Sequence, residues 1–157
     1  MDGRRRDVLK TGGGATLLAL LAAAGWLKPA DAEAQAWNKA AFETRTMDET
    51  MKALGGGAPA QSKDVTFVST PDIAENGAVV PIGVASAIPK TEAIAILVEK
   101  NPNMLAALFE IPPGTDPAIS TRVKMGQTSN VYALVKADGK YYVASKEIKV
   151  TLGGCGG

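Results

Sequence analysis

The sequence predicts an all-β protein: an immunoglobulin-like antiparallel β-sandwich of about seven strands, preceded by an N-terminal helix and followed by a flexible C-terminal arm. Three observations lead to this fold class. Short runs rich in Val, Ile, Thr and aromatic residues recur through residues 65–151. Turn signals built from Pro, Gly, Asn and Asp separate these runs at intervals of about 8–12 residues. The later runs also alternate apolar and polar residues with a period of two.

The chain begins with the three-part layout of an export signal. Basic residues at the start precede an apolar run over residues 15–27 and then an alanine-rich stretch, which offers cleavage after Ala32, Ala34 or Ala36. The apolar run is short and rich in alanine for a membrane span, although an uncleaved anchor helix is the alternative. The basic part resembles the twin-arginine export motif, carried here by Arg5, Arg6, Leu9 and Lys10. Residues 1–36 are therefore predicted to be a twin-arginine-type signal peptide.

The predicted domain, residues 37–152, opens with one amphipathic helix over residues 37–54. Apolar residues recur there at helical spacing: Phe42, Met47, Met51 and Leu54. The Gly55-Gly56-Gly57 run is predicted to end the helix, because glycine readily adopts the left-handed conformation of a C-terminal cap.

The strands follow in order. The first three predicted strands cover residues 65–68, 78–84 and 93–98. Pro81 indicates an edge or a bulge within the second strand, because proline cannot donate a hydrogen bond to a neighbouring strand. The third run is continuously apolar, which is typical of a strand buried on both faces or of a buried helix; its isoleucines favour the strand.

Four further strands are predicted over residues 105–111, 119–125, 131–136 and 141–151. The last two flank residues 137–140, where Asp138-Gly139 is a strong signal for a hairpin turn. The predicted domain therefore ends with a β-hairpin whose second strand leads directly into the C-terminal arm.

Charge excludes several classes of partner. Removing residues 1–36 removes five of the 17 basic residues and four of the 16 acidic ones, so twelve of each remain. A formally neutral domain has no basic field to attract nucleic acid or an anionic membrane. We therefore expect neither partner once the signal has been removed.

The residue inventory argues against catalysis by this chain alone. The sequence has no histidine and one cysteine. A Ser-His or Cys-His pair therefore cannot form within it, and neither can a structural zinc site or an iron–sulfur site. We expect no catalytic residue, no bound metal and no resident cofactor.

The single cysteine, Cys155, lies between two pairs of glycines at the end of the sequence: Gly153, Gly154, Gly156 and Gly157. Glycine resists any fixed conformation, so residues 153–157 are predicted to form a flexible arm. A thiol placed there contributes nothing to a core, and an exposed free thiol is a liability in an oxidising compartment. The pattern predicts a covalent carrier whose sulfur holds a group for other proteins.

Three alternatives remain open for this terminus. Cys155 could be a stray surface thiol, or it could crosslink an exported binding module to a scaffold through an intermolecular disulfide. A terminal Gly-Gly also occurs in ubiquitin-like sulfur carriers, which load sulfur on the terminal carboxyl group. Those proteins have a β-grasp fold and need cytoplasmic ATP, and the export leader argues against them.

Together, the leader, the sandwich and the terminal Gly-Gly-Cys-Gly-Gly resemble SoxY, the sulfur-carrier subunit of the periplasmic Sox thiosulfate-oxidising system. The resemblance implies that Cys155 is the covalent attachment site for sulfur intermediates and that the protein is periplasmic. It also implies a heterodimer with a SoxZ-like subunit. The partner enzymes that it implies are a c-type cytochrome sulfur-transferase, a di-metal hydrolase that releases sulfate, and a sulfane dehydrogenase; haem and metal belong to those partners.

Overall fold

The computed structural model describes residues 38–151. These residues belong to one compact unit. It contains two short helices, α3 (Lys39–Phe42) and α4 (Met47–Ala53), followed only by strands. The strands are β1 (Ala60–Gln61), β2 (Val65–Val68), β3 (Ile73–Ala74), β4 (Val80–Ser86), β5 (Thr91–Val98), β6 (Leu105–Glu110), β7 (Ala118–Val123), β8 (Ser129–Ala137) and β9 (Lys140–Val150).

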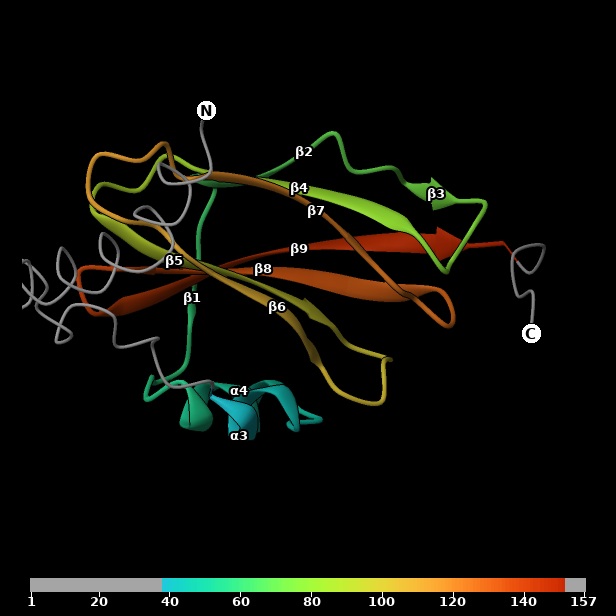
Figure 1. Cartoon of the computed structure of the whole chain (residues 1–157), viewed down its shortest axis with the longest axis horizontal. Coiled ribbons are helices and arrows are strands. Elements are labelled where there is room, and N and C mark those ends of the chain that lie inside the picture. Colours follow the sequence, from blue (N-terminus) through green and yellow to red (C-terminus); the bar gives the residue numbers. More distant parts are fainter. Residues whose placement is uncertain (1–37, 152–157) are drawn as a thin grey trace, which may run out of the picture. The chain divides into compact units, whose positions relative to one another are not determined.

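The strands form two sheets, as expected for a sandwich. The larger sheet has the order β1-β9-β8-β5-β6, with β3 also paired to β9, and the smaller has the order β2-β4-β7 (Figure 1). Most pairs are antiparallel, whereas β1 and β3 each run parallel to β9. A buried apolar cluster between the sheets includes Ile82, Ile96 and Val135. The predicted all-β sandwich is confirmed.

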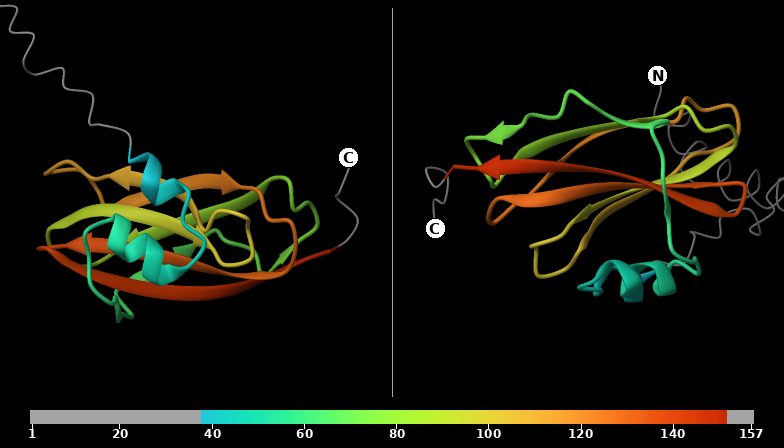
Figure 2. Two further views of the ribbon diagram at one scale, coloured as in Figure 1. Left: turned by 90° about the horizontal axis from the view of Figure 1, so that it is seen from below. Right: turned by 180° about the vertical axis from the view of Figure 1, so that it is seen from behind.

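Strand β5 is buried on both faces, because two different layers cover it. Ile94 and Ile96 belong to the cluster between the two sheets. Ala95 and Leu97, which alternate with them, belong to a second cluster that includes residues of both helices. Figure 2 shows the helices lying against the outer face of the larger sheet. The continuous apolar run is therefore a strand, as its isoleucines indicated.

The prediction of one continuous helix over residues 37–54 is wrong for its described part, residues 38–54. The chain leaves the helix after Phe42, and the carbonyl oxygen of Thr44 accepts a hydrogen bond from the amide of Met104 at 2.7 Å. A new helix begins at Met47, and the side chain of Thr46 caps it by accepting from the amide of Glu49. These two hydrogen bonds stabilise the break, because neither could form in a continuous helix. The spacing of the apolar residues did not reveal the break.

The glycines after α4 end the helix as predicted. Gly55 has a φ of 72°. The amide of Gly55 donates to the carbonyl of Lys52, and that of Gly56 donates to the carbonyl of Met51. This pair of bonds is the Schellman motif of helix C-termini. The hydroxyl of Tyr141 then donates to the carbonyl of Leu54 at 2.9 Å, which fastens the helix end to β9.

The predicted hairpin turn is also confirmed. Asp138 and Gly139 connect β8 to β9 with φ values of 49° and 72°, the positive pair that a two-residue type I′ turn requires. Pro81 lies in β4 opposite Arg122 of β7, while the pairing of β4 with β2 ends at Gly83. The proline therefore occupies a locally single-sided part of the strand, as its missing donor predicted.

Neither of the helices in residues 38–151 is long and apolar enough to cross a membrane.

Candidate functional site

The sequence-predicted site lies outside the described residues. This holds for Cys155 and the four arm glycines, and equally for the export motif of Arg5, Arg6, Leu9 and Lys10. The described chain reaches Thr151, four residues before Cys155. What the structure does show is the point from which the cysteine-bearing segment departs. We call residues 149–151 the arm root.

Strand β3 holds one side of the arm root. It pairs in parallel with the end of β9, with Ile73 opposite Lys149 and Ala74 opposite Val150 (Figure 1). The amide of Lys149 donates to the carbonyl of Asp72 at 2.9 Å, and that of Thr151 donates to the carbonyl of Ala74 at 3.1 Å. Backbone hydrogen bonds thus order β9 up to the last described residue.

The side chain of Thr128 holds the other side of the arm root. The regular pairing of β8 with β9 ends at Ser129 opposite Ile148. One step further, the hydroxyl of Thr128 accepts a hydrogen bond from the amide of Val150 at 3.0 Å. The threonine hydroxyl takes the place of a backbone acceptor, so the strand stays bound on both sides beyond the end of β8.

Close backbone packing supports the arm root from the β3–β4 connection. The amide of Met125 donates to the carbonyl of Gly77 at 2.7 Å. A Cβ atom added to Gly77 would collide with the carbonyl oxygen of Met125 and would lie 2.8 Å from Cγ1 of Val150. Only glycine fits here, because any side chain would push the connection away from β9.

Lys146, in β9, binds the loop that precedes β3. Its ammonium lies 3.0 Å from a carboxylate oxygen of Asp72 and donates to the carbonyl of Thr70 at 2.6 Å. The Lys146 side chain is only 25% exposed, whereas that of Asp72 is 88% exposed. The lysine therefore acts chiefly as a tie between β9 and the loop that leads into β3.

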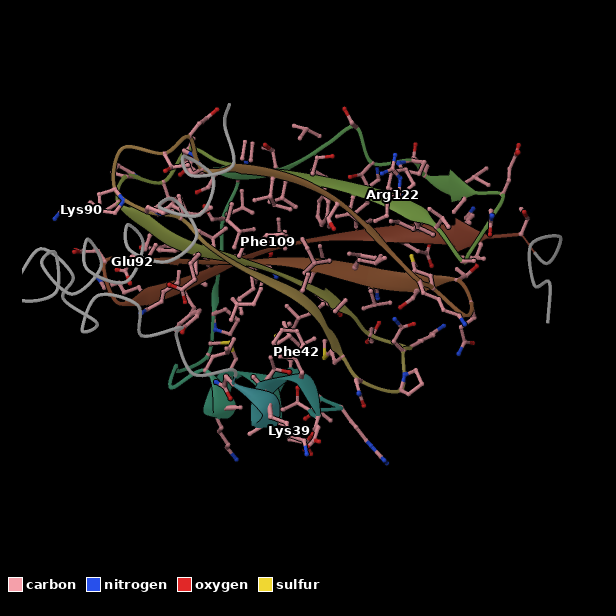
Figure 3. All side chains as sticks on the ribbon, viewed as in Figure 1. Lys39, Phe42, Lys90, Glu92, Phe109 and Arg122 are labelled. Atoms are coloured by element: carbon pink, nitrogen blue, oxygen red, sulfur yellow. The ribbon has the colours of Figure 1, made fainter. Side chains whose placement is uncertain are left out.

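The main electrostatic feature elsewhere is the pair of Glu92 and Lys136. Their charged atoms lie 2.9 Å apart, and the carboxylate also accepts from the amide of Gly139 in the hairpin turn. The hydrogen bond to Lys136 lowers the pKa of Glu92, and the same bond raises the pKa of Lys136. Figure 3 shows Glu92 at the opposite end of the sheet from β3. Each pKa shift favours the charged form of its group, so both side chains stay charged at neutral pH. We therefore interpret the pair as a clamp on the turn and not as a proton donor or acceptor.

The two tyrosines with raised pKa values and the cavity of the described chain lie apart from the arm root. Residues 38–151 contain no group of three or more His, Cys, Asp or Glu that could hold a metal ion. Burial raises the pKa of Tyr132 and of Tyr141, which keeps both phenols protonated. A cavity of about 280 Å³ lies between the β4–β5 and β6–β7 loops. The hydroxyls of Ser86 and Thr91 on its wall form a hydrogen bond with each other at 2.8 Å, so they already have a partner within the domain.

Sequence reasoning missed the residues that position the arm root. Ala74 and Thr128 carry no signal in the sequence, because one contributes only its backbone and the other is an ordinary loop threonine. An Asn-Gly pair such as Asn76-Gly77 is a typical turn signal, and the amide of the next residue, Ala78, donates to the side chain of Asn76 at 2.9 Å. The close approach of Gly77 to Met125 could not be inferred from that signal.

Comparison with known proteins places the chain among the sulfur carrier proteins of sulfur oxidation. The family model described as "Sulfur oxidation protein SoxY" matches residues 50–155, a range that ends at Cys155. The chain belongs to the SoxY family.

A solved structure agrees with this assignment. The sulfur carrier protein SoxY from Chlorobium limicola f thiosulfatophilum is 38% identical, with a TM-score of 0.60, over 67% of this chain and 96% of that one. A superoxide reductase (neelaredoxin) from Ignicoccus hospitalis is 18% identical over 55% of this chain and 79% of its own, with a TM-score of 0.48. At that identity no functional conclusion follows from the second likeness. No curated protein sequence matches the chain.

Proposed function

We propose that this protein is a covalent carrier for sulfur intermediates of thiosulfate oxidation, which it holds on the thiol of Cys155 and presents to partner enzymes. The observation that carries the proposal is the match to the SoxY family up to Cys155 itself. The geometry of the arm root supports it. The chain is bound on both sides as far as Val150 and on one side at Thr151, so the glycine-flanked cysteine starts from a fixed point on the domain.

In the proposed loading step, the thiol of Cys155 and one thiosulfate dianion form a sulfur–sulfur bond. The product is a cysteine S-thiosulfonate that carries one negative charge. The thiol proton is released to solvent, and two electrons pass to the haem of a c-type cytochrome sulfur-transferase. Because no base or cation precedes the thiol in the sequence of the arm, the partner enzyme supplies the activation.

In the next proposed step, a di-metal hydrolase attacks the terminal sulfonate with water. The bond between the outer two sulfur atoms breaks, sulfate and one proton leave, and a persulfide remains on Cys155. A sulfane dehydrogenase then oxidises the outer sulfur of the persulfide with oxygen atoms from water; the protons go to solvent and the electrons pass to the electron acceptor of that enzyme. Covalent attachment prevents the loss of these reactive groups between enzymes and raises their effective concentration at each one.

The same proposal assigns this chain the role of a substrate for its partners and not that of an enzyme. It includes a heterodimer with a SoxZ-like subunit, twin-arginine export with removal of residues 1–36, and residence in the periplasm. Haem and metal belong to the partner enzymes, and the only group that this chain carries is the sulfur intermediate on Cys155.

The decisive measurement is the intact mass of the protein purified from its host grown on thiosulfate, with and without reductant. The proposal expects mass increments of sulfane or thiosulfonate groups that map to Cys155 and disappear on reduction. A protein that carries only a disulfide to a second polypeptide would instead identify an exported binding module. A thiol that is unmodified under all conditions would contradict the carrier role.

A further inference from the structure

The large apolar side chains that are exposed in the described chain all fall in one short stretch. Within residues 38–151 they are Val68, Ile73 and Val79, at 42%, 56% and 50% exposure. Single exposed apolar residues scattered over a surface need no explanation. These three are concentrated within residues 68–79, and two of them belong to the segment of residues 73–79 that holds the arm root.

The fold requires these side chains to point outward but does not require them to be apolar. In β3, Ala74 is buried at 5% exposure, so strand alternation turns Ile73 to solvent. Val80 is fully buried at the start of β4, which leaves the preceding Val79 on the outside. A polar residue at either position would satisfy the same backbone, and two large apolar residues there need another reason.

The length of the chain beyond Thr151 supplies that reason. Cys155 lies four positions after Thr151, and four fully extended residues span at most about 14 Å. Any catalytic centre that acts on the sulfur of Cys155 must therefore come within about that distance of Thr151. The hydroxyl of Thr151 lies 3.5 Å from the carbonyl oxygen of Glu75, and its amide bonds to Ala74, so residues 73–79 border the point of departure. An enzyme that engages the cysteine therefore has to come close to this surface.

We propose that Ile73 and Val79 form a docking surface for the enzyme that loads Cys155, and that this enzyme presents an apolar rim around the mouth of its active site. The inference rests on the proposed function, because only a cysteine that is processed by an enzyme imposes this distance limit. Burial of the two side chains on docking stabilises the encounter, and the fixed arm root directs the cysteine into the active site.

The test measures steady-state loading of the full mature protein, in complex with its partner subunit, by the host's c-type cytochrome sulfur-transferase with thiosulfate. The double variant Ile73→Ser, Val79→Ser removes the apolar surface without adding charge, so repulsion of the thiosulfate anion cannot account for an effect. We expect its KM as a carrier to rise roughly fivefold to thirtyfold, with kcat within about twofold of wild type. The single variants Ile73→Glu and Val79→Glu should each raise KM as well.

Ala87→Ser and Ala87→Glu are the matched controls. Ala87 is also exposed, but it follows β4 at the end away from the arm root (Figure 1). Both controls should keep the wild-type KM. All variants should also react with a small disulfide reagent at the wild-type rate, because their cysteine is unchanged.

The outcomes separate the docking surface from the carrier role. Wild-type loading with an unchanged KM in the double variant would overturn the docking surface and leave the carrier role standing. Loss of partner-subunit binding in that variant would also overturn it, since residues 73–79 would then belong to the heterodimer interface. Wild-type protein that is never loaded would contradict the proposed function and this inference together.

Discussion

The amide of Thr151 donates a hydrogen bond to the carbonyl oxygen of Ala74 at 3.1 Å. Through this bond, a strand of only two residues, β3, orders the chain up to the point where the cysteine-bearing segment begins. The domain thus determines where the arm starts, and the sequence of the arm determines what it carries.

Replacement of Cys155 by serine should abolish sulfur loading and thiosulfate oxidation, because the alcohol oxygen cannot form the sulfur–sulfur bond. The variant should keep the unfolding temperature and the partner binding of wild type, since residue 155 lies beyond the sandwich. The checks are intact mass after incubation with the loading enzyme, thermal unfolding, and co-purification with the partner subunit. Activity that persists in the serine variant would rule out the carrier role.

Bulk in the arm should matter more than length. Replacing Gly154 and Gly156 with tryptophan should reduce turnover by the partner enzymes strongly, because side chains widen a segment that has to enter an active-site channel. Insertion of two further glycines before Gly153 adds only about 7 Å of reach and should be tolerated better. Turnover measured on both variants decides the matter, and equal rates would show that no narrow channel is involved.

Gly77→Ala should destabilise the arm root. The new Cβ would collide with the carbonyl oxygen of Met125 and crowd Val150, so we expect a loss of about 1–3 kcal/mol in the free energy of unfolding. Exchange of the Thr151 amide hydrogen should accelerate as well, because β9 loses support at its end.

Gly126→Ala is the control for that variant, since a Cβ there meets nothing within 4 Å. It should change the free energy of unfolding by less than about 0.5 kcal/mol. Denaturant unfolding and hydrogen exchange measure both effects. Equal stabilities for the two alanine variants would disprove the close packing of Gly77 against Met125.

The Glu92–Lys136 pair should give stability a defined pH dependence. The bond to Lys136 holds the pKa of Glu92 below its usual 4.5, so this contribution is present above 4.5 and is lost as pH falls through the folded-state pKa. The pKa of Lys136 is raised above its usual 10.5, so the contribution persists below 10.5 and is lost as pH rises further.

Glu92→Gln should therefore lower the unfolding temperature slightly at neutral pH, because the pair is partly exposed. The difference from wild type should shrink as the pH falls through the folded-state pKa of Glu92, which lies below 4.5, because the carboxylate of the wild type then becomes protonated. Glu147→Gln, which removes an exposed carboxylate from the same sheet, is the control for net charge. A difference between Glu92→Gln and wild type that stays constant as the pH falls from about 7 to well below 4.5 would argue against the ion pair as its source.

Local sequence patterns predicted most of the sandwich. The bounds of β2 coincide with the predicted strand over residues 65–68, and the Asp138-Gly139 turn joins β8 to β9 as predicted. Such features depend on neighbouring residues, which a single sequence displays directly. The break between α3 and α4 was missed because it depends on Met104, a residue far along the chain.

The predicted site divides in the same way. Cys155 and its glycines are recognisable from composition and position alone, and they lie outside the described residues, so their roles stay predictions. The arm root depends on contacts of residues 72–77 and Thr128 with β9, which join distant parts of the sequence. Two-residue strands such as β1 and β3 have too few residues to show a period of two, so the sequence pattern could not predict them.

The geometry of β9 also has a mechanical consequence. The strand is 11 residues long, and its hydrogen bonds to β8 and to the two short parallel strands run across its axis. Tension applied along β9 from its C-terminal end therefore loads these bonds together, in shear, and does not peel them one after another. An enzyme that binds and pulls the terminal segment would therefore apply force to a strand that is hydrogen-bonded along its whole length.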